Sequence, residues 1–226
     1  MTLTLAEELM LLSYDREGGR PLVNPLINTT ERDYCLVAAA LFELAMAGRL
    51  KYENKKLVVV DDTPVGDPDL DKILRKIARS RRARSVDWWL QNFYSPRMYK
   101  RLLHRLVGRG ILRPEKQRKF GLPWSTRYIE QDPRPEHEIR DRLERVVVHR
   151  GPPDERTATL AGLVHTAKLD KKLFPQMENR DLRNRMKEIR EQSWAGQEAY
   201  KASVYTALSL AAMAAVAGGA AVATSS

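Results

Sequence analysis

The sequence predicts a single, mainly α-helical globular domain with two small β-hairpins and a buried C-terminal helix. Its 226 residues, 43 % of them hydrophobic and 30 % charged, are enough to bury a sizeable core. Apolar residues recur at helical spacing in most segments, and the predicted strands do not alternate with helices as a parallel sheet would require. We expect residues 1–219 to form the domain and residues 220–226 to form a disordered tail.

The first elements have clear boundary signals. Thr4 precedes a short helix over residues 5–12, and a longer helix over about residues 31–47 ends at Gly48. Two β-rich arms within residues 50–62 flank a polar turn and predict the first hairpin. The order at this end of the chain is therefore helix, helix and hairpin.

The middle of the chain adds three helices and a second hairpin. Asp67 caps a helix that begins at Pro68, where the missing N–H of proline costs nothing. The buried stripe of this helix consists of Leu70, Ile73, Leu74 and Ile77. After a basic linker, residues 85–94 and 96–110 form helices, and residues 111–131 form the second hairpin.

The C-terminal part is predicted to be helical almost throughout. Helices over residues 138–149 and 154–168 are followed by a loop or short hairpin over residues 169–181. A strongly charged helix then continues to Glu191. These segments complete a mainly α-helical chain.

The last 24 residues, 203–226, carry no charge. A run of this length is typical of a membrane-spanning helix. Alanine dominates it, however, and gains little by entering lipid, while Gly218 and Gly219 interrupt the helix. The sequence therefore favours a helix buried in the protein core, with a spanning helix as the alternative.

Positive charge is concentrated in one part of the chain. The whole sequence has 39 Lys and Arg against 29 Asp and Glu, a net charge of +10. Residues 75–119 alone hold fifteen bases and two acids, a net charge of +13. Such a field concentrates anionic partners, namely nucleic acid, an anionic lipid surface or an acidic protein. In the same part, Trp88 and Trp89 point about 100° apart on a helix, so one packs in the core and the other lies at its boundary.

No catalytic or metal-binding motif is present. The four histidines lie one to a predicted helix, without the spacing of a metal site, at His104, His137, His149 and His165. Cys35 suits a buried helix better than the role of a nucleophile, and a single cysteine fits a reducing compartment. Acids stand where a signal peptide would have its basic start. We therefore expect a cytoplasmic binding protein without metal or cofactor, and not an enzyme.

A loop that carries Leu173 and Phe174 directly behind Lys171 and Lys172 suits membrane insertion. The apolar tip would enter the bilayer interface while the lysines meet anionic head groups, at about 1 kcal/mol per charge. In an equally weighted alternative, Phe174 folds back on the core.

Five motifs, in this order and spacing, resemble the Golgi phosphoprotein 3 family, including its bacterial members, over nearly the whole chain. They are LTLAEELMLLSYDREG (3–18), LFELAMAGRLK (41–51), DDTPVGDPDLDKIL (61–74), LVGRGILRPEKQ (106–117) and LAGLVHTAKL (160–169). The resemblance implies a single helical domain with a buried C-terminal helix and no catalysis. It also implies a peripheral membrane protein, since eukaryotic members bind phosphatidylinositol 4-phosphate in a basic pocket beside an inserting hairpin and act as adaptors for Golgi enzymes.

In that pocket a tryptophan, an arginine and two bases on a later helix hold the head group. By the resemblance, Arg142 and Arg145 fall where the two bases lie, and their spacing on one helix face suits a phosphate clamp. Val23 and Val37 stand where the tryptophan and the arginine would be. A shifted alignment brings in two further bases, Arg20 and Arg32. The segment LDKKLFPQM, residues 169–177, matches the inserting hairpin in place.

We therefore predict a cytoplasmic protein that is peripherally associated with the membrane and binds anionic or inositol phospholipid, with a protein client as a further expected partner. A DNA-binding protein is the alternative, with nucleic acid as the less favoured partner. The order helix, Gly-Arg and hairpin occurs twice, and together with the basic segment 75–119 it suits a winged helix. The helix over residues 96–110 interleaves its bases with leucines, which is more typical of an amphipathic surface helix than of a recognition helix.

Overall fold

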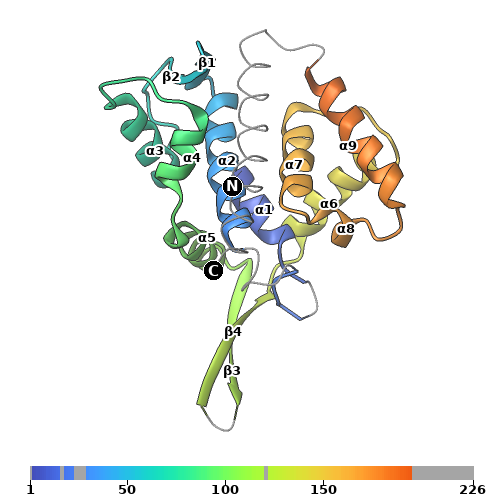
Figure 1. The fold of residues 1–226 in the computed structure, drawn as a ribbon. Coiled ribbons are helices and arrows are strands. Elements are labelled where there is room, and N and C mark those ends of the chain that lie inside the picture. The colour runs from blue at the N-terminus through green and yellow to red at the C-terminus, as the bar shows by residue number, and fades with distance from the viewer. Residues whose placement is uncertain (1, 16–17, 23–28, 120–121, 195–226) are drawn as a thin grey trace, which may run out of the picture.

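Helices α1 and α2 form the centre of the fold (Figure 1). The computed structural model describes residues 2–15, 18–22, 29–119 and 122–194. All eight residues of α1 (Leu5–Leu12) are buried, and so is the stretch Cys35–Phe42 of α2 (Thr29–Met46). Thr4 Oγ1 accepts a hydrogen bond from the N–H of Glu7, and the Glu7 carboxylate accepts one from the N–H of Thr4. This reciprocal cap confirms the predicted start of the first helix.

The next five elements follow the predicted order. They are β1 (Leu50–Glu53), β2 (Lys56–Val59), α3 (Pro68–Ala78), α4 (Val86–Phe93) and α5 (Pro96–Gly108). The turn between β1 and β2 consists of Asn54 and Lys55, which both have positive φ. Asp67 caps α3 as predicted, because its Oδ1 accepts from the N–H groups of Asp69 and Leu70 at 3.0 and 3.1 Å.

Strands β3 (Leu112–Lys119) and β4 (Leu122–Glu130) form an antiparallel hairpin that projects from the helical body (Figure 1). The base of the hairpin rests on the segment after α1. There the N–H of Tyr128 donates to the carbonyl of Gly19 at 3.1 Å, and the ring of Tyr14 meets the ring of Tyr128 edge-on. Gly19 has φ +58°, and a Cβ on it would lie 2.7 Å from the carbonyl oxygen of Tyr128. Only glycine allows this close approach without strain.

Four helices complete the described part of the chain: α6 (Arg134–Val147), α7 (Glu155–Thr166), α8 (Asp170–Leu173) and α9 (Asn179–Trp194). α7 packs against both α6 and α9. Arg185 of α9 is 2 % exposed, and its guanidinium donates to the carbonyls of Val146 and Gly151. Because Val146 lies in the last turn of α6 and Gly151 lies in the segment that follows, the buried arginine ties α9 to the end of α6.

The helices divide into two groups around α1 and α2. α3, α4 and α5 lie on one side, and α6 to α9 lie on the other (Figure 1). α2 contacts α3, α4, α5 and α7, so one core connects both groups. The fold class is therefore confirmed as a single, mainly α-helical domain with two antiparallel hairpins. The predicted C-terminal helix within residues 203–226 and the tail at 220–226 lie outside the described residues.

Two single-residue predictions within the core are confirmed. Cys35 is 0 % exposed in α2. Trp89 is 1 % exposed, whereas its neighbour Trp88 is 37 % exposed at the boundary.

Candidate functional site

Arg142, one half of the predicted phosphate clamp, faces a buried acid. Its Nη2 donates to Oε2 of Glu8 at 2.7 Å, and Nε of Arg156 donates to Oε1 of the same carboxylate at 3.0 Å. Glu8 is 3 % exposed, so burial raises its pKa, and the two guanidiniums act against that rise. Arg142, which is half-buried, thus serves as a counter-ion to a buried carboxylate, while Arg145 lies exposed one turn further along α6.

The other two predicted arginines lie near the base of the β3–β4 hairpin. Arg32 forms an ion pair with Asp33 at 2.9 Å, and its guanidinium lies 3.6 Å from the centre of the Tyr99 ring. Arg20 is exposed next to the segment on which the hairpin rests. Val37 is 0 % exposed in α2, and Val23 lies outside the described residues. The structure therefore places the four arginines in different surroundings, and only Arg20 and Arg145 are exposed.

The segment predicted as a loop or short hairpin forms α8 and a turn, which corrects that prediction. The helical turn lets Leu173 and Phe174 pack on the core together, where they are 8 % and 4 % exposed. Lys171 and Lys172 remain exposed. The alternative in which Phe174 folds back on the core describes this arrangement. Insertion of the two apolar side chains into a membrane would require α8 to open.

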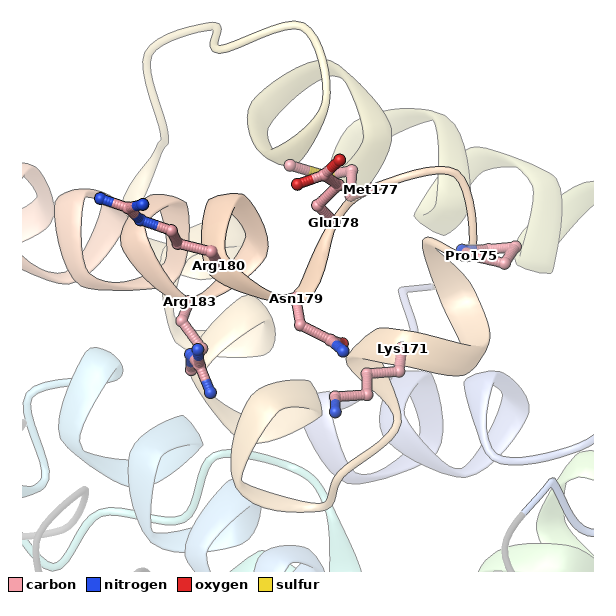
Figure 2. Close-up of a pocket in the computed structure, with 7 residues that line it drawn as sticks. All are labelled: Lys171, Pro175, Met177, Glu178, Asn179, Arg180 and Arg183. Carbon is pink, nitrogen blue, oxygen red and sulfur yellow. The ribbon is translucent and has the colours of Figure 1, made fainter.

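Directly beside this turn lies an open hollow of about 640 Å³ between α8 and the start of α9 (Figure 2). Its lining consists of Lys171, Pro175, Met177, Glu178, Asn179, Arg180 and Arg183. In Figure 2, Lys171 of α8 and Asn179 at the start of α9 lie close to each other, and Arg180 and Arg183 extend from α9 in different directions. The hollow thus forms where two short stretches of the chain meet.

The hollow is electropositive. Its lining includes three bases, Lys171, Arg180 and Arg183, but a single acid, Glu178, and none of the three bases forms an ion pair with another described residue. The N-terminus of α9 adds the partial positive charge of its unpaired N–H groups. An anion such as a phosphate group would therefore be stabilised here. The sequence predicted only Lys171. The i, i+3 spacing of Arg180 and Arg183 puts both on one face of a helix, but it does not show that α8 lies beside them.

The basic segment 75–119 is partly neutralised by acids from elsewhere. Arg105 and Arg109 form ion pairs with Glu7 of α1 at 3.2 and 3.3 Å. Arg101 forms an ion pair with Asp69 of α3 at 2.8 Å. These three bases belong to α5 and its C-terminal end, the part that a winged helix would present to DNA, so the pairing does not favour the DNA-binding alternative.

Neither a metal centre nor a membrane span is found in the described residues. No group of three or more His, Cys, Asp or Glu side chains there could hold a metal ion. Within the same residues, no helix combines the length and apolar character that crossing a bilayer requires.

The chain was compared with known protein families. A family model described as Golgi phosphoprotein 3 (GPP34) matches residues 5–206, which is nearly the whole chain. This family is known for binding phosphoinositides at the Golgi, and it is a lipid-binding and adaptor family rather than a family of enzymes. The match spans both helix groups and both hairpins, and we conclude that this chain belongs to the Golgi phosphoprotein 3 family.

Proposed function

We propose that the protein is a peripheral membrane protein that binds anionic phospholipid, including phosphoinositides, at the hollow between α8 and α9. The observation that supports this most is the excess of three exposed bases over one acid around the hollow. Membership of a phosphoinositide-binding family agrees with it. Adaptor activity toward a protein client and a cytoplasmic location are further parts of the proposal.

Electrostatics alone makes this attachment weak. Each base near an anionic lipid surface contributes about 1 kcal/mol, so Lys171, Arg180 and Arg183 together contribute about 3 kcal/mol. Exposed charges are screened over about 8 Å at physiological ionic strength. Stable attachment therefore needs an apolar contact as well.

The projecting β3–β4 hairpin is the element best placed to supply that contact. It stands clear of the helical body in Figure 1, whereas the apolar side chains of the α8 turn are buried. In its backbone register Lys119 pairs with Leu122, and Trp124 follows within β4. We propose that this hairpin, rather than Leu173 and Phe174, enters the bilayer interface while nearby bases meet the head groups.

Co-sedimentation with liposomes tests the proposal. The vesicles contain neutral lipid alone, or neutral lipid with phosphatidylglycerol, phosphatidylinositol or phosphatidylinositol 4-phosphate, at low and at physiological salt. The site variant is Arg180→Ala/Arg183→Ala. Its matched control, Arg82→Ala/Arg84→Ala, removes the same charge from exposed positions of the other helix group. Arg145→Ala tests the exposed half of the predicted clamp.

We expect the wild type and the control to bind anionic vesicles and the site variant to lose at least about tenfold in affinity, because two of three contributions of about 1 kcal/mol are removed. A preference for phosphatidylinositol 4-phosphate over phosphatidylglycerol at matched surface charge would identify a head-group site. Equal loss in both double variants would show attraction by net charge only. Absence of binding to every anionic vesicle at low salt would disprove the membrane proposal.

A further inference from the structure

A second basic hollow, of about 500 Å³, lies at the start of α4. It is lined by Lys56, Arg82, Ala83, Arg84, Ser85 and Trp88. The N–H of Leu57 in β2 donates to the carbonyl of Arg84 at 2.9 Å, so the linker between α3 and α4 is held against the first hairpin. Ser85 caps α4 by accepting from the N–H of Trp88. The hollow is thus built from three elements with fixed backbone positions.

The basic stretch 75–84, which includes Arg82 and Arg84 of this hollow, is not neutralised. Six bases lie within ten residues, at Arg75, Lys76, Arg79, Arg81, Arg82 and Arg84, and all are exposed. None of the six forms an ion pair with any residue that the structure describes, in contrast to Arg101, Arg105 and Arg109 further along the chain. The one acid in residues 75–95 is Asp87. Close packing of like charges without counter-ions is unfavourable unless a polyanion neutralises them.

A tryptophan stands at the edge of the same hollow. Trp88 is 37 % exposed, and with Val60 it is one of two large exposed hydrophobic side chains in the described residues. Its ring meets the ring of buried Trp89 edge-on, with centres 4.7 Å apart, and Trp89 in turn stacks on Phe93. The guanidinium of Arg84 lies 4.9 Å from the centre of the Trp88 ring. Buried neighbours therefore fix an exposed aromatic ring among cations.

This combination identifies the chemistry of a ligand. Exposed basic side chains along an extended stretch attract a chain of phosphates, and an exposed aromatic ring offers a stacking surface to a planar nucleobase. Duplex DNA shields its nucleobases and is read by a helix in the major groove, but in α5 two of the arginines that could do so, Arg101 and Arg105, are paired with acids. A membrane bound at the α8–α9 hollow would meet the other side of the molecule (Figure 1).

We propose that the hollow formed by Lys56, Arg82, Arg84 and Trp88 binds single-stranded nucleic acid. The three basic side chains contact phosphates, and one nucleobase stacks on Trp88. The proposal does not rest on membrane binding, because it uses different residues on the other helix group.

Fluorescence anisotropy with labelled 12-nucleotide oligouridylate and oligothymidylate tests the proposal. A duplex of equal length and a polyglutamate of equal charge serve as competitors. Three variants are compared with the wild type: Arg82→Ala/Arg84→Ala, Trp88→Ala and Trp88→Phe. Arg180→Ala/Arg183→Ala is the matched control, since it removes equal charge from the other hollow. Thermal unfolding verifies that each variant is folded.

We expect a single strand to bind more tightly than either competitor. Trp88→Ala should weaken binding at least about fivefold, and Trp88→Phe should restore most of it because it keeps a stacking ring. Arg82→Ala/Arg84→Ala should reduce the slope of log K against the logarithm of the salt concentration by about 1.4, because each lost phosphate contact changes it by about 0.7. The control should leave both quantities unchanged.

Four results would overturn the proposal: no binding at low salt, equal binding of polyglutamate, no effect of Trp88→Ala, or equal loss in the control. Equal binding of polyglutamate would assign the hollow to acidic peptides. Equal loss in the control would reduce the interaction to net charge. Failure here leaves the liposome result unaffected, so the two proposals are tested separately.

Discussion

Arginine has two distinct roles in this protein, and the neighbours of each side chain decide between them. Arg142 and Arg156 neutralise Glu8, and Arg105 neutralises Glu7, because α1 buries both of its acids. Removing such a partner leaves a buried charge uncompensated, at about 3–5 kcal/mol. Exposed arginines without acidic partners carry no such penalty. Their substitution should therefore change binding and leave stability nearly unaltered.

Asp67 allows the internal pairing to be tested by pH. Burial acts to raise the pKa of this carboxyl, but donors from Arg105 and from the N–H groups of Leu70 and Asp69 outweigh it, so the pKa lies below its usual value of 3.8. The stabilisation is therefore complete well above pH 3.8 and is lost as the pH falls through the lowered folded-state pKa. Asp67→Asn keeps a capping oxygen and removes the charge. We expect it to lower the free energy of unfolding by about 1 kcal/mol at pH 7 and by less below pH 3.8.

Urea unfolding at pH 7, 5 and 3 measures this difference. Asp62→Asn is the control, because Asp62 is exposed and makes no ion pair with a described residue. If the difference in the free energy of unfolding between wild type and Asp67→Asn grew as the pH fell, the result would contradict the lowered pKa of Asp67.

At the scale of elements, local signals predicted most boundaries. Thr4, Asp67 and Asp154 cap helices as their side chains suggest, and Gly48 and Gly110, both with positive φ, follow the ends of α2 and α5. α8 escaped prediction because four residues are too few to show a helical period. The hollow between α8 and α9 could not be predicted for another reason. Arg180 and Arg183 become a site only when α9 folds against the α8 turn, and no local pattern encodes that contact.

Gly19 controls how the projecting hairpin docks. With φ +58°, any side chain there is strained by about 1–2 kcal/mol, and its Cβ would also meet the carbonyl of Tyr128 at 2.7 Å. Gly48 has φ +71°, but a Cβ there would meet no atom within 4 Å, so Gly48→Ala isolates the backbone strain. We expect Gly19→Ala to destabilise the protein clearly more than Gly48→Ala in urea unfolding. Equal losses would mean that the hairpin base adjusts without cost.

At the scale of the whole molecule, the two hollows lie on separate helix groups. α3 and α4 pack on one side of α2, and α8 and α9 pack on α7 at the other (Figure 1). The single-domain fold could be predicted from the sequence because most helices have a clear apolar period and several have a capping side chain. The division of charge between the two sides could not, because it depends on which arginines find acids across the core.

If both proposals hold, one molecule can bind both partners at once. We expect a labelled oligonucleotide to sediment with phosphatidylglycerol vesicles only when the protein is present. Arg82→Ala/Arg84→Ala should remove the oligonucleotide and leave the protein on the vesicles. Displacement of the protein from vesicles by added oligonucleotide would instead show that both anions compete for one surface.

The burial of Cys35 has a practical consequence. The chain has one cysteine, and its side chain lies in the middle of α2 with no exposed surface. A thiol reagent reaches it only when the core opens, so the rate of modification reports the opening of the whole domain. The same shielding lets a cysteine introduced on the β3–β4 hairpin or beside Trp88 carry a probe selectively. The native protein is therefore already suited to spectroscopic work on its surfaces, without prior removal of its own thiol.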